Sequence, residues 1–300
     1  MHLDVGNGHY IYFEEYGNPA GVPILFIHGG PGLGCSEGDK VFFDPDKFHV
    51  IFIDQRGCGK SIPKGELAFN TTEDLLVDMI SVLDFLNIEQ VVVFGGSWGA
   101  TLAILLAAKY SNRVIKLIIR GFFSATSECM RIYLRGEIRT THPENWERVS
   151  SFVPSVWKGR EAEFYFMAIN EKVDNYQLLG QEWARYGLSL SRKYFAKGEV
   201  DQIMTVGTVD YDRIRIELHY ALNHCFISES HVFDQAVNVS APTTIIHGRY
   251  DYICPLEDAM RLDSILIDST LKIADGGHST SDPEIKKALF EELNQLQFKN

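Results

Sequence analysis

The chain has 300 residues, 45% of them hydrophobic, which suffices for one or two domains with a sizeable buried core. Its formal net charge is −12 without a basic patch, so a nucleic-acid partner is not expected. The sequence has no apolar run of about 18 residues and no signal-peptide pattern, so neither a membrane span nor a membrane partner is expected.

The first 123 residues alternate between expected strands and helices. A capping-box pattern at 71–74 predicts the start of a helix, and leucines, an isoleucine and a methionine then recur at helical spacing. A second helix is expected at 100–108. Strand–helix alternation is typical of a parallel sheet. The expected strands lie at 10–16, 23–27, 50–53, 91–94 and 116–120.

The pattern changes after Phe123 and resumes near residue 237. The segment 124–236 holds charged and aromatic helical patterns and three of the four tryptophans, which predicts a helical lid rich in aromatic surface. Strands are again expected at 243–246 and 269–273, and a final helix runs from Pro283 to about Phe298. We therefore predict a catalytic core formed by 1–123 and 237–300, with a helical cap at 124–236.

The central motif is a serine between an expected strand and an expected helix. The strand at 91–94 runs into Gly95-Gly96-Ser97-Trp98-Gly99, and good helix formers follow. A G-x-S-x-G sequence between a strand and a helix is typical of the nucleophile elbow of an α/β-hydrolase. The glycines two residues to either side leave room for the crossing strand and helix. The elbow would hold the Ser97 oxygen at the positive end of the helix.

A serine needs a base, and the base needs a group that orients it. In this fold the acid and then the histidine follow the serine along the chain. Asp251 and His278 have that order, and each comes just after an expected strand. Parallel sheets place their sites at that edge. His28 and His247 also follow strands, but they precede glycine turns and are expected to be structural hydrogen-bonding groups.

Two backbone donors are needed to stabilise the oxyanion. One is expected to be the N–H of Trp98, the residue after the nucleophile. The other is expected from the glycine-rich loop after the strand at 23–27, where Gly29 and Gly30 permit a close approach. A plain tight turn is the alternative for this loop.

Several segments together resemble the prolyl aminopeptidases (proline iminopeptidases) of the α/β-hydrolase superfamily. The resemblance implies a mostly parallel central sheet flanked by helices, an inserted helical cap, and release of N-terminal proline from peptides. It also implies the triad Ser97, Asp251 and His278. The matching segments are H-G-G-P-G at 28–32, D-Q-R-G-C-G-K-S at 54–61, G-G-S-W-G-A-T-L at 95–102, R-G-F-F at 120–123, H-G-R-Y-D at 247–251 and G-G-H-S at 276–279.

The cap segments of the resemblance imply a substrate pocket. Arg215-Ile216-Glu217-Leu218-His219-Tyr220 is similar to the family's R-I-E-x-H-Y, whose glutamate helps hold the substrate's amino end. An ammonium entering a low-dielectric pocket needs such a partner, which is consistent with this role for Glu217. The expected substrate-binding residues are therefore Glu217, Tyr133, Phe123 and Arg120, with Phe123 and Tyr133 forming an apolar wall for a pyrrolidine ring.

The sequence departs from the family at one position. The family's second cap glutamate lies in W-S-x-W-E-G, whereas here the closest segment, 183–188, has Gly187 in place of the acid. Glu182 and Glu199 are the nearest acids that could substitute. Loss of one buried carboxylate would weaken amine recognition by about 1–3 kcal/mol.

The expected function is therefore a serine hydrolase that acts on a short peptide or small acyl substrate through an acyl-enzyme. An esterase or amidase that needs no free amine is the alternative, and a non-catalytic binding protein is a third, disfavoured by the intact triad. No cofactor is expected, and no metal, because H-E-x-x-H or a similar spacing is missing from the sequence. The cysteines are odd in number and irregularly spaced, so a cytoplasmic location is expected. They are Cys35, Cys58, Cys129, Cys225 and Cys254.

Overall fold

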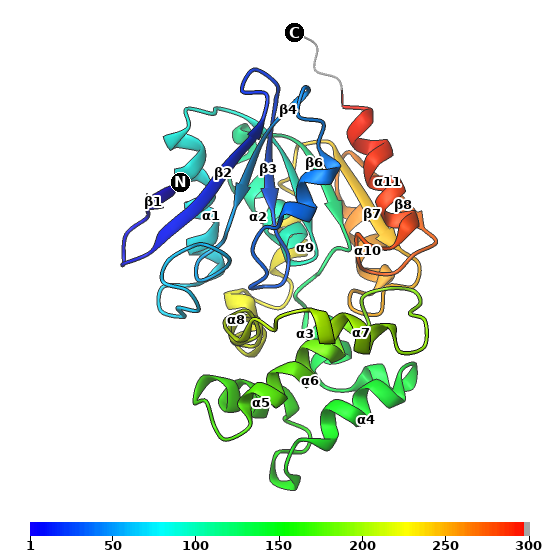
Figure 1. The fold of residues 1–300 in the computed structure, drawn as a ribbon. Helices are drawn as coiled ribbons and strands as arrows, with labels where there is room; N and C mark the ends of the chain where they lie inside the picture. Colours follow the sequence, from blue (N-terminus) through cyan, green and yellow to red (C-terminus); the bar gives the residue numbers. More distant parts are fainter. Residues whose placement is uncertain (297–300) are drawn as a thin grey trace.

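An eight-stranded sheet forms the centre of the computed structural model, which describes residues 1–296 (Figure 1). The strand order is β1-β2-β4-β3-β5-β6-β7-β8, antiparallel for β1 and β2 and parallel from β4 to β8. The expected α/β-hydrolase sheet is confirmed, and β1 is an additional edge strand. The strands are β1 His2–Asp4, β2 Tyr10–Gly17, β3 Val22–Ile27, β4 Phe48–Ile53, β5 Val91–Gly96, β6 Val114–Arg120, β7 Thr243–Gly248 and β8 Ser269–Ala274.

The sheet is buried on both faces because alternate apolar side chains of the inner strands enter two separate cores. One core contains Val91 and Val93 together with residues of four helices: α1 Thr72–Phe85, α2 Trp98–Lys109, α9 His231–Ala236 and α10 Leu256–Ile265. The opposite core contains Val92 and Phe94 with apolar residues of α11 Pro283–Asn294 and of the 3₁₀ helix Glu37–Phe42. Helices therefore cover both faces, as the alternation of elements predicts.

Two of the predicted helix starts agree with the structure, whereas α2 begins at Trp98, two residues before the expected start at 100. Thr71 caps α1, and Thr71 and Asp74 form the expected capping box. α11 begins at Pro283 as predicted and ends at Asn294; Phe298, the predicted end, lies outside the described residues. Within residues 1–296, no helix is both long and apolar enough to cross a membrane.

One side chain of α11 ties this helix to the sheet. Glu292 accepts hydrogen bonds from Lys116 of β6 at 2.6 Å, Thr244 of β7 at 2.8 Å and Lys272 of β8 at 2.7 Å. Burial by itself would raise the pKa of Glu292, but these hydrogen bonds outweigh it and lower the pKa to about 2. The charged Glu292 side chain therefore links α11 to three strands of the sheet.

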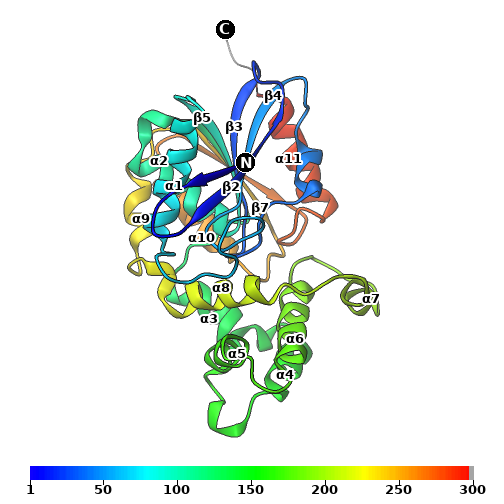
Figure 2. The same ribbon diagram turned by 60° about the vertical axis from the view of Figure 1, so that its left-hand side comes forward.

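A group of helices between β6 and β7 lies over the carboxyl end of the sheet as a separate layer (Figures 1 and 2). Figure 2 shows α8 between the sheet and α4, α5 and α6. α9 belongs to the same chain segment but packs against α2 in the core. The other helices are α3 Ser127–Leu134, α4 Pro143–Ser151, α5 Glu161–Asn170, α6 Tyr176–Ser189, α7 Glu199–Val206 and α8 Tyr211–Leu222.

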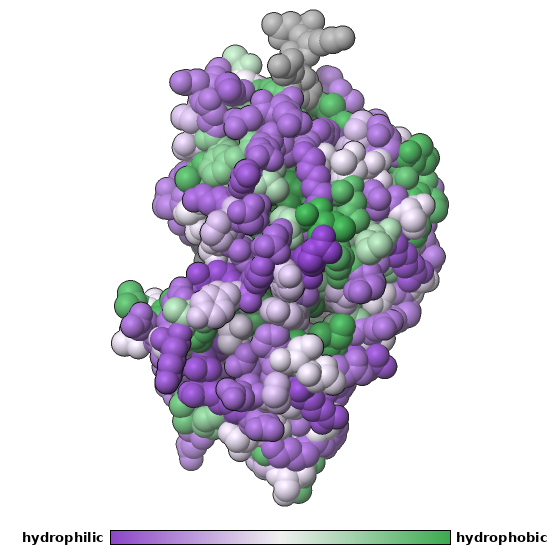
Figure 3. Space-filling view, turned by 90° about the vertical axis from the view of Figure 1, so that its right-hand side faces the viewer, coloured by the Kyte–Doolittle hydropathy of each residue, from purple (hydrophilic) through white to green (hydrophobic). Residues whose placement is uncertain are grey.

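The tryptophans of this segment correct the expectation of a lid with an aromatic surface. Trp146 and Trp183 are buried, and both pack against the ring of Tyr186 with centroids 5.8 Å apart. They form an interior for the helical layer itself. The face shown in Figure 3 is accordingly mostly hydrophilic, with apolar residues in scattered patches.

Candidate active site

Ser97 lies at the sharp turn between β5 and α2, with φ 57° and ψ −121°. A side chain at Gly95 would overlap the backbone of Gly99, and one at Gly99 would overlap the carbonyl oxygen of Ile27. The turn therefore requires glycine on both sides of the serine. The backbone strain at Ser97 holds its side chain clear of the sheet, in the manner expected of a nucleophile elbow.

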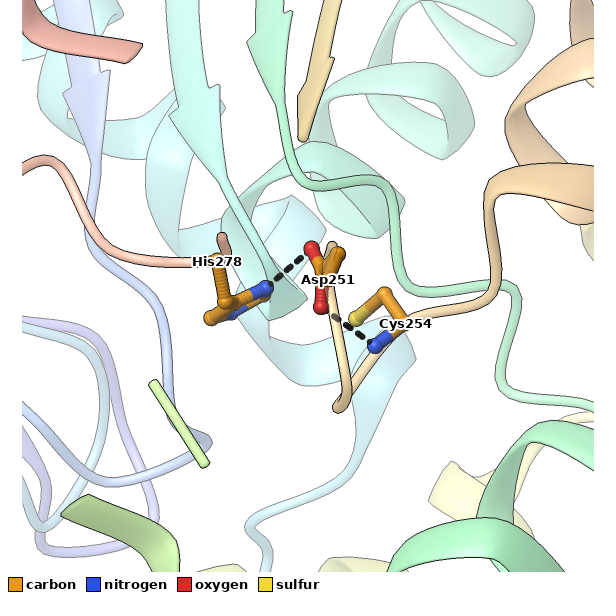
Figure 4. A group of neighbouring side chains, drawn as sticks. All are labelled: Asp251, Cys254 and His278. Carbon is orange, nitrogen blue, oxygen red and sulfur yellow. Dashed lines mark hydrogen bonds and ion pairs between the residues drawn. The ribbon is translucent and has the colours of Figure 1, made fainter. Parts of the chain in front are cut away.

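His278 and Asp251 meet at the same edge of the sheet. They follow β8 and β7, whose carboxyl ends are in register at Gly248 and Ala274. His278 Nδ1 lies 2.7 Å from Asp251 Oδ2, as Figure 4 shows. Asp251 Oδ1 accepts from the backbone N–H groups of Ile253 at 2.9 Å and Cys254 at 2.8 Å. Asp251 is thus fixed on both oxygens and orients the imidazole.

The charge of Asp251 is maintained despite complete burial of its side chain. Burial would raise its pKa, but the neighbouring His278 and His247 and the backbone N–H of Cys254 lower it to about 2. An ionised Asp251 favours the tautomer of His278 with the proton on Nδ1, which leaves Nε2 as the basic nitrogen.

Ser97 and His278 line one cavity of about 680 Å³ beneath the helical layer. Within residues 1–296 no hydrogen bond joins the Ser97 hydroxyl to His278. Such bonds often tighten only when substrate is bound. The cavity falls within the usual range of about 300–1,000 Å³ for small-molecule sites.

The loop after β3 approaches the elbow closely. A Cβ at Gly29 would lie 2.9 Å from the oxygen of Gly96 and 3.2 Å from Cβ of Ser97. Gly30 has φ +119°, which favours glycine. Trp98 is the first residue of α2, so its N–H has no acceptor within the helix. Gly29 and Trp98 therefore lie beside Ser97, and Gly29 and Gly30 line the same cavity as the serine.

The other two histidines that follow strands are buried hydrogen-bonding groups. His28 accepts at Nε2 from the backbone N–H of Gln55, at 3.0 Å. His247 Nε2 lies 3.0 Å from the carbonyl oxygen of Cys254. Burial lowers the pKa of both imidazoles, which favours their neutral forms.

Gly121 and Arg120 position the His–Asp pair, and the sequence reasoning missed this role. Gly121 has φ +54°, and a Cβ there would lie 3.0 Å from Nδ1 and Cε1 of His278. Arg120 Nη1 donates to the carbonyl oxygen of His278 at 2.8 Å. Arg120 also lines the cavity, where it was expected to bind substrate. The Arg120-Gly121 pair at the end of an expected strand was visible in the sequence. Its contact with His278, which lies 157 residues after Gly121, was not.

Glu217 lies in the wall that α8 contributes to the cavity. Its Oε1 accepts from the hydroxyl of Tyr133 and from Nε1 of Trp183, both at 3.1 Å. Burial raises the pKa of Glu217, while the charge of Arg213 and these two hydrogen bonds oppose the rise. Two donors on one oxygen fix the carboxylate and leave Oε2 available to a ligand.

The two residues expected to form an apolar wall, and the position of the missing acid, all lie on the cavity wall. Phe123 and Tyr133 line the cavity, and the Phe123 ring also packs edge-on against Trp98. Gly187 lines the cavity too, and a Cβ there would lie 2.7 Å from the Tyr133 hydroxyl.

Neither substitute for the missing second acid reaches the cavity. Glu182 forms an ion pair with Arg148 at 2.6 Å. Glu199 forms one with Arg192 at 2.5 Å. The expectation that either could replace the acid at Gly187 is therefore wrong, since both carboxylates are engaged elsewhere.

Asp251, Cys254 and His278 bring three potential metal-ligand atoms within 4.8 Å of one another (Figure 4). The Asp251 oxygens already accept three hydrogen bonds, one of them from His278. Burial raises the pKa of the Cys254 thiol well above its ordinary range, so a thiolate is strongly disfavoured there. A metal ion would have to break this arrangement, and the cluster fits a hydrogen-bonded pair better than a metal centre.

The sequence is similar to known proteins over nearly its whole length. A family model described as alpha/beta hydrolase fold matches residues 22–284. Proline iminopeptidase from Neisseria meningitidis serogroup B is 33% identical over 303 residues, covering 98% of this chain and 95% of that protein. Proline iminopeptidase from Arabidopsis thaliana is 32% identical, covering 96% of this chain and 77% of that protein.

Solved structures share the fold. Proline iminopeptidase from Mycobacterium smegmatis superposes with a TM-score of 0.65 at 19% identity, covering 98% of this chain and 97% of that one. An esterase from Exiguobacterium antarcticum gives 0.69 at 18% identity, with the same coverage of both chains. At these identities the likeness establishes the fold alone, since a peptidase and an esterase both have it.

Proposed function

The chain belongs to the proline iminopeptidases, a family with the α/β-hydrolase fold, and we propose that it releases N-terminal proline from short peptides through an acyl-enzyme on Ser97. As a member of that family it is a serine hydrolase. The observation that carries the substrate proposal is Glu217, a buried carboxylate with one free oxygen in the same cavity as Ser97. A buried carboxylate gains most from a cationic partner, and the N-terminal ammonium supplies one.

In the proposed mechanism the Ser97 oxygen attacks the carbonyl carbon of the N-terminal residue. His278 Nε2 takes the hydroxyl proton, and Asp251 stabilises the imidazolium through the 2.7 Å contact at Nδ1. The N–H of Trp98 and the loop of Gly29 and Gly30 bind the oxyanion. His278 then gives the proton to the departing amine nitrogen as the C–N bond breaks.

Water completes the turnover. It attacks the ester carbonyl of the acyl-enzyme while His278 accepts one of its protons. The proton passes to the Ser97 oxygen as the ester bond breaks, and the free amino acid leaves. These steps use only groups of this chain.

We further propose that helices α3 to α8 act as a cap over core segments 1–123 and 237–300. The last helix of the expected cap segment 124–236, α9, packs against α2 and belongs with the core. The position of Tyr133, Gly187 and Glu217 on the cavity wall supports this division. A reducing compartment such as the cytoplasm is our proposal for the location. It is supported by the absence of any disulfide among the five cysteines, all within residues 1–296.

An esterase or amidase that ignores the amine is the second candidate. Gly187 and the nearby charge of Arg213 both favour it, because position 187 supplies no second acid and the positive charge of Arg213 offsets part of the charge of Glu217. Activity would then depend on the acyl group alone.

Steady-state hydrolysis of a proline arylamide, its N-acetylated form and a short-chain aryl ester separates the two, with Ser97→Ala as the control. We expect the free proline substrate to exceed the acetylated form in kcat/KM by about a hundredfold, equivalent to about 2.7 kcal/mol. If acetylation makes no difference and the ester is the better substrate, the aminopeptidase proposal fails.

A further inference from the structure

The face of α8 that borders the cavity carries both acidic and basic side chains. Asp210, the N-cap residue of α8, Arg213 and Glu217 all line the cavity. Arg213 and Glu217 are four residues apart, so they lie on the same face of the helix, about 6 Å apart along its axis. Figure 2 shows this helix between the sheet and the rest of the helical layer.

The two acids of this face are already engaged. Asp210 forms an ion pair with Lys64 at 2.8 Å and accepts from the backbone N–H of Arg213 at 3.2 Å. Glu217 Oε1 accepts from Tyr133 and Trp183. Neither acid lies within ion-pair distance of the Arg213 side chain.

Unlike these two acids, the Arg213 side chain has no partner among residues 1–296. Its Nε is buried without a hydrogen-bond partner, and across residues 1–296 its guanidinium forms neither an ion pair nor a hydrogen bond. Buried polar atoms are normally hydrogen-bonded, and an arginine has acids available in a chain of net charge −12. An unpaired guanidinium facing a cavity therefore indicates a ligand with a negative charge.

The backbone of Arg213 lies against the glycine-rich loop that borders Ser97. A Cβ at Gly32 would lie 2.6 Å from the carbonyl oxygen of Arg213 and 3.2 Å from its Cα. Gly32 belongs to the same loop as Gly29, which packs against Ser97. The start of α8 is thus packed against the loop expected to bind the oxyanion, and Arg213 lines the same cavity as Ser97.

We propose that Arg213 binds the C-terminal carboxylate of the substrate, so that the preferred substrates are dipeptides with a free amine and a free carboxylate. The inference rests on the proposed function, in which Glu217 holds the amine. An extended chain spans about 3.3–3.6 Å per residue, so a dipeptide is about 7 Å long, comparable with the rise of about 6 Å between positions 213 and 217 on α8. The planar guanidinium offers two parallel donors that suit a carboxylate.

The test compares Pro-Gly with Pro-Gly-amide, which differ only in the terminal charge. We expect the wild type to favour Pro-Gly at least tenfold in kcat/KM, and Arg213→Gln to reduce that ratio at least tenfold. Arg215→Gln is the matched control, because Arg215 lies two residues away on α8, donates to Asn170 at 2.8 Å and does not line the cavity. It should preserve the ratio.

A second substrate pair separates the terminal carboxylate from a side-chain carboxylate. Pro-Asp-amide and Pro-Asn-amide differ in charge only on the second side chain. If the wild type prefers Pro-Asp-amide but treats Pro-Gly and Pro-Gly-amide alike, the inference is overturned in favour of an acidic second residue. Equal values for both pairs, or equal loss of ratio in both arginine variants, also overturns it.

The proline arylamide distinguishes failure of this inference from failure of the function. It has a free amine but no carboxylate. If the wild type cleaves it and shows no preference for Pro-Gly over Pro-Gly-amide, the role of Arg213 is wrong and the aminopeptidase proposal stands. If the wild type cleaves neither the arylamide nor the dipeptides, the proposed function itself has failed.

Discussion

Replacing Glu217 by glutamine isolates the charge of the carboxylate from its packing. The glutamine oxygen can still accept from Tyr133 and Trp183, the two donors that lie 3.1 Å from Oε1. The free oxygen is replaced by an NH2 group on the cavity side, and the negative charge is lost. We therefore expect the free energy of unfolding to change by less than about 1 kcal/mol, since Tyr133 and Trp183 both keep their acceptor.

The kinetic effect follows from the contact that the charge makes with an ammonium. A hydrogen bond to a charged group contributes about 1.5–3 kcal/mol. The nearby charge of Arg213 opposes part of the attraction, which favours the lower end, about 1.5–2 kcal/mol. We expect Glu217→Gln to lower kcat/KM for a proline arylamide about 10–30-fold.

The assay measures kcat/KM for the proline arylamide beside an aryl ester that has no amine. The ester should change by less than about threefold, because it makes no ion pair with Glu217. An equal loss for both substrates would refute the reasoning and make Glu217 a structural residue. An unchanged arylamide rate would place the amine elsewhere.

The pH dependence provides an independent check. Burial raises the pKa of Glu217 above its ordinary value, and only the ionised form attracts an ammonium. As the pH falls through this raised pKa, KM for the arylamide should rise. The rise should be missing in Glu217→Gln, and its persistence there would assign it to another group.

Three further predictions concern positions outside the amine site. Asp251→Asn should lower kcat about 10⁴-fold with little change in KM, because an amide cannot stabilise the imidazolium of His278; steady-state rates near wild type would contradict this. Gly121→Ala should lower kcat about 10–100-fold by displacing His278, with a stability loss of about 1 kcal/mol at φ +54°; an unchanged kcat would show that the ring tolerates the methyl group. Glu292→Gln should cost about 2 kcal/mol in urea unfolding at pH 7. That difference should fall by more than half at pH 3, because the lowered pKa of about 2 stabilises the fold only while the carboxylate is ionised, and a constant difference would contradict it.

The fold and the meeting of Asp251 and His278 at one edge of the sheet could be predicted from the sequence because they are encoded in short stretches. The strands that surround the elbow are continuous apolar runs, and the turn needs glycine at 95 and 99, whichever side chains surround it. The chain order of Ser97, Asp251 and His278 is likewise a property of the topology. The helical layer between β6 and β7 was harder to predict, since helical periodicity shows which face is apolar but not what covers it, and Trp146 and Trp183 are interior residues.

The sequence by itself thus determined the elements, the sheet and the three residues brought to its edge, because local periodicity and turn chemistry act over a few residues. Only the tertiary structure decided which charged side chains line the cavity and which of them are already paired. The pairing of Glu182 with Arg148, the two donors on Glu217 and the unpaired Arg213 all depend on contacts between or within the helices α3 to α8. Residues such as Gly121 and His278 are 157 positions apart and become neighbours only when parallel strands bring their carboxyl ends together.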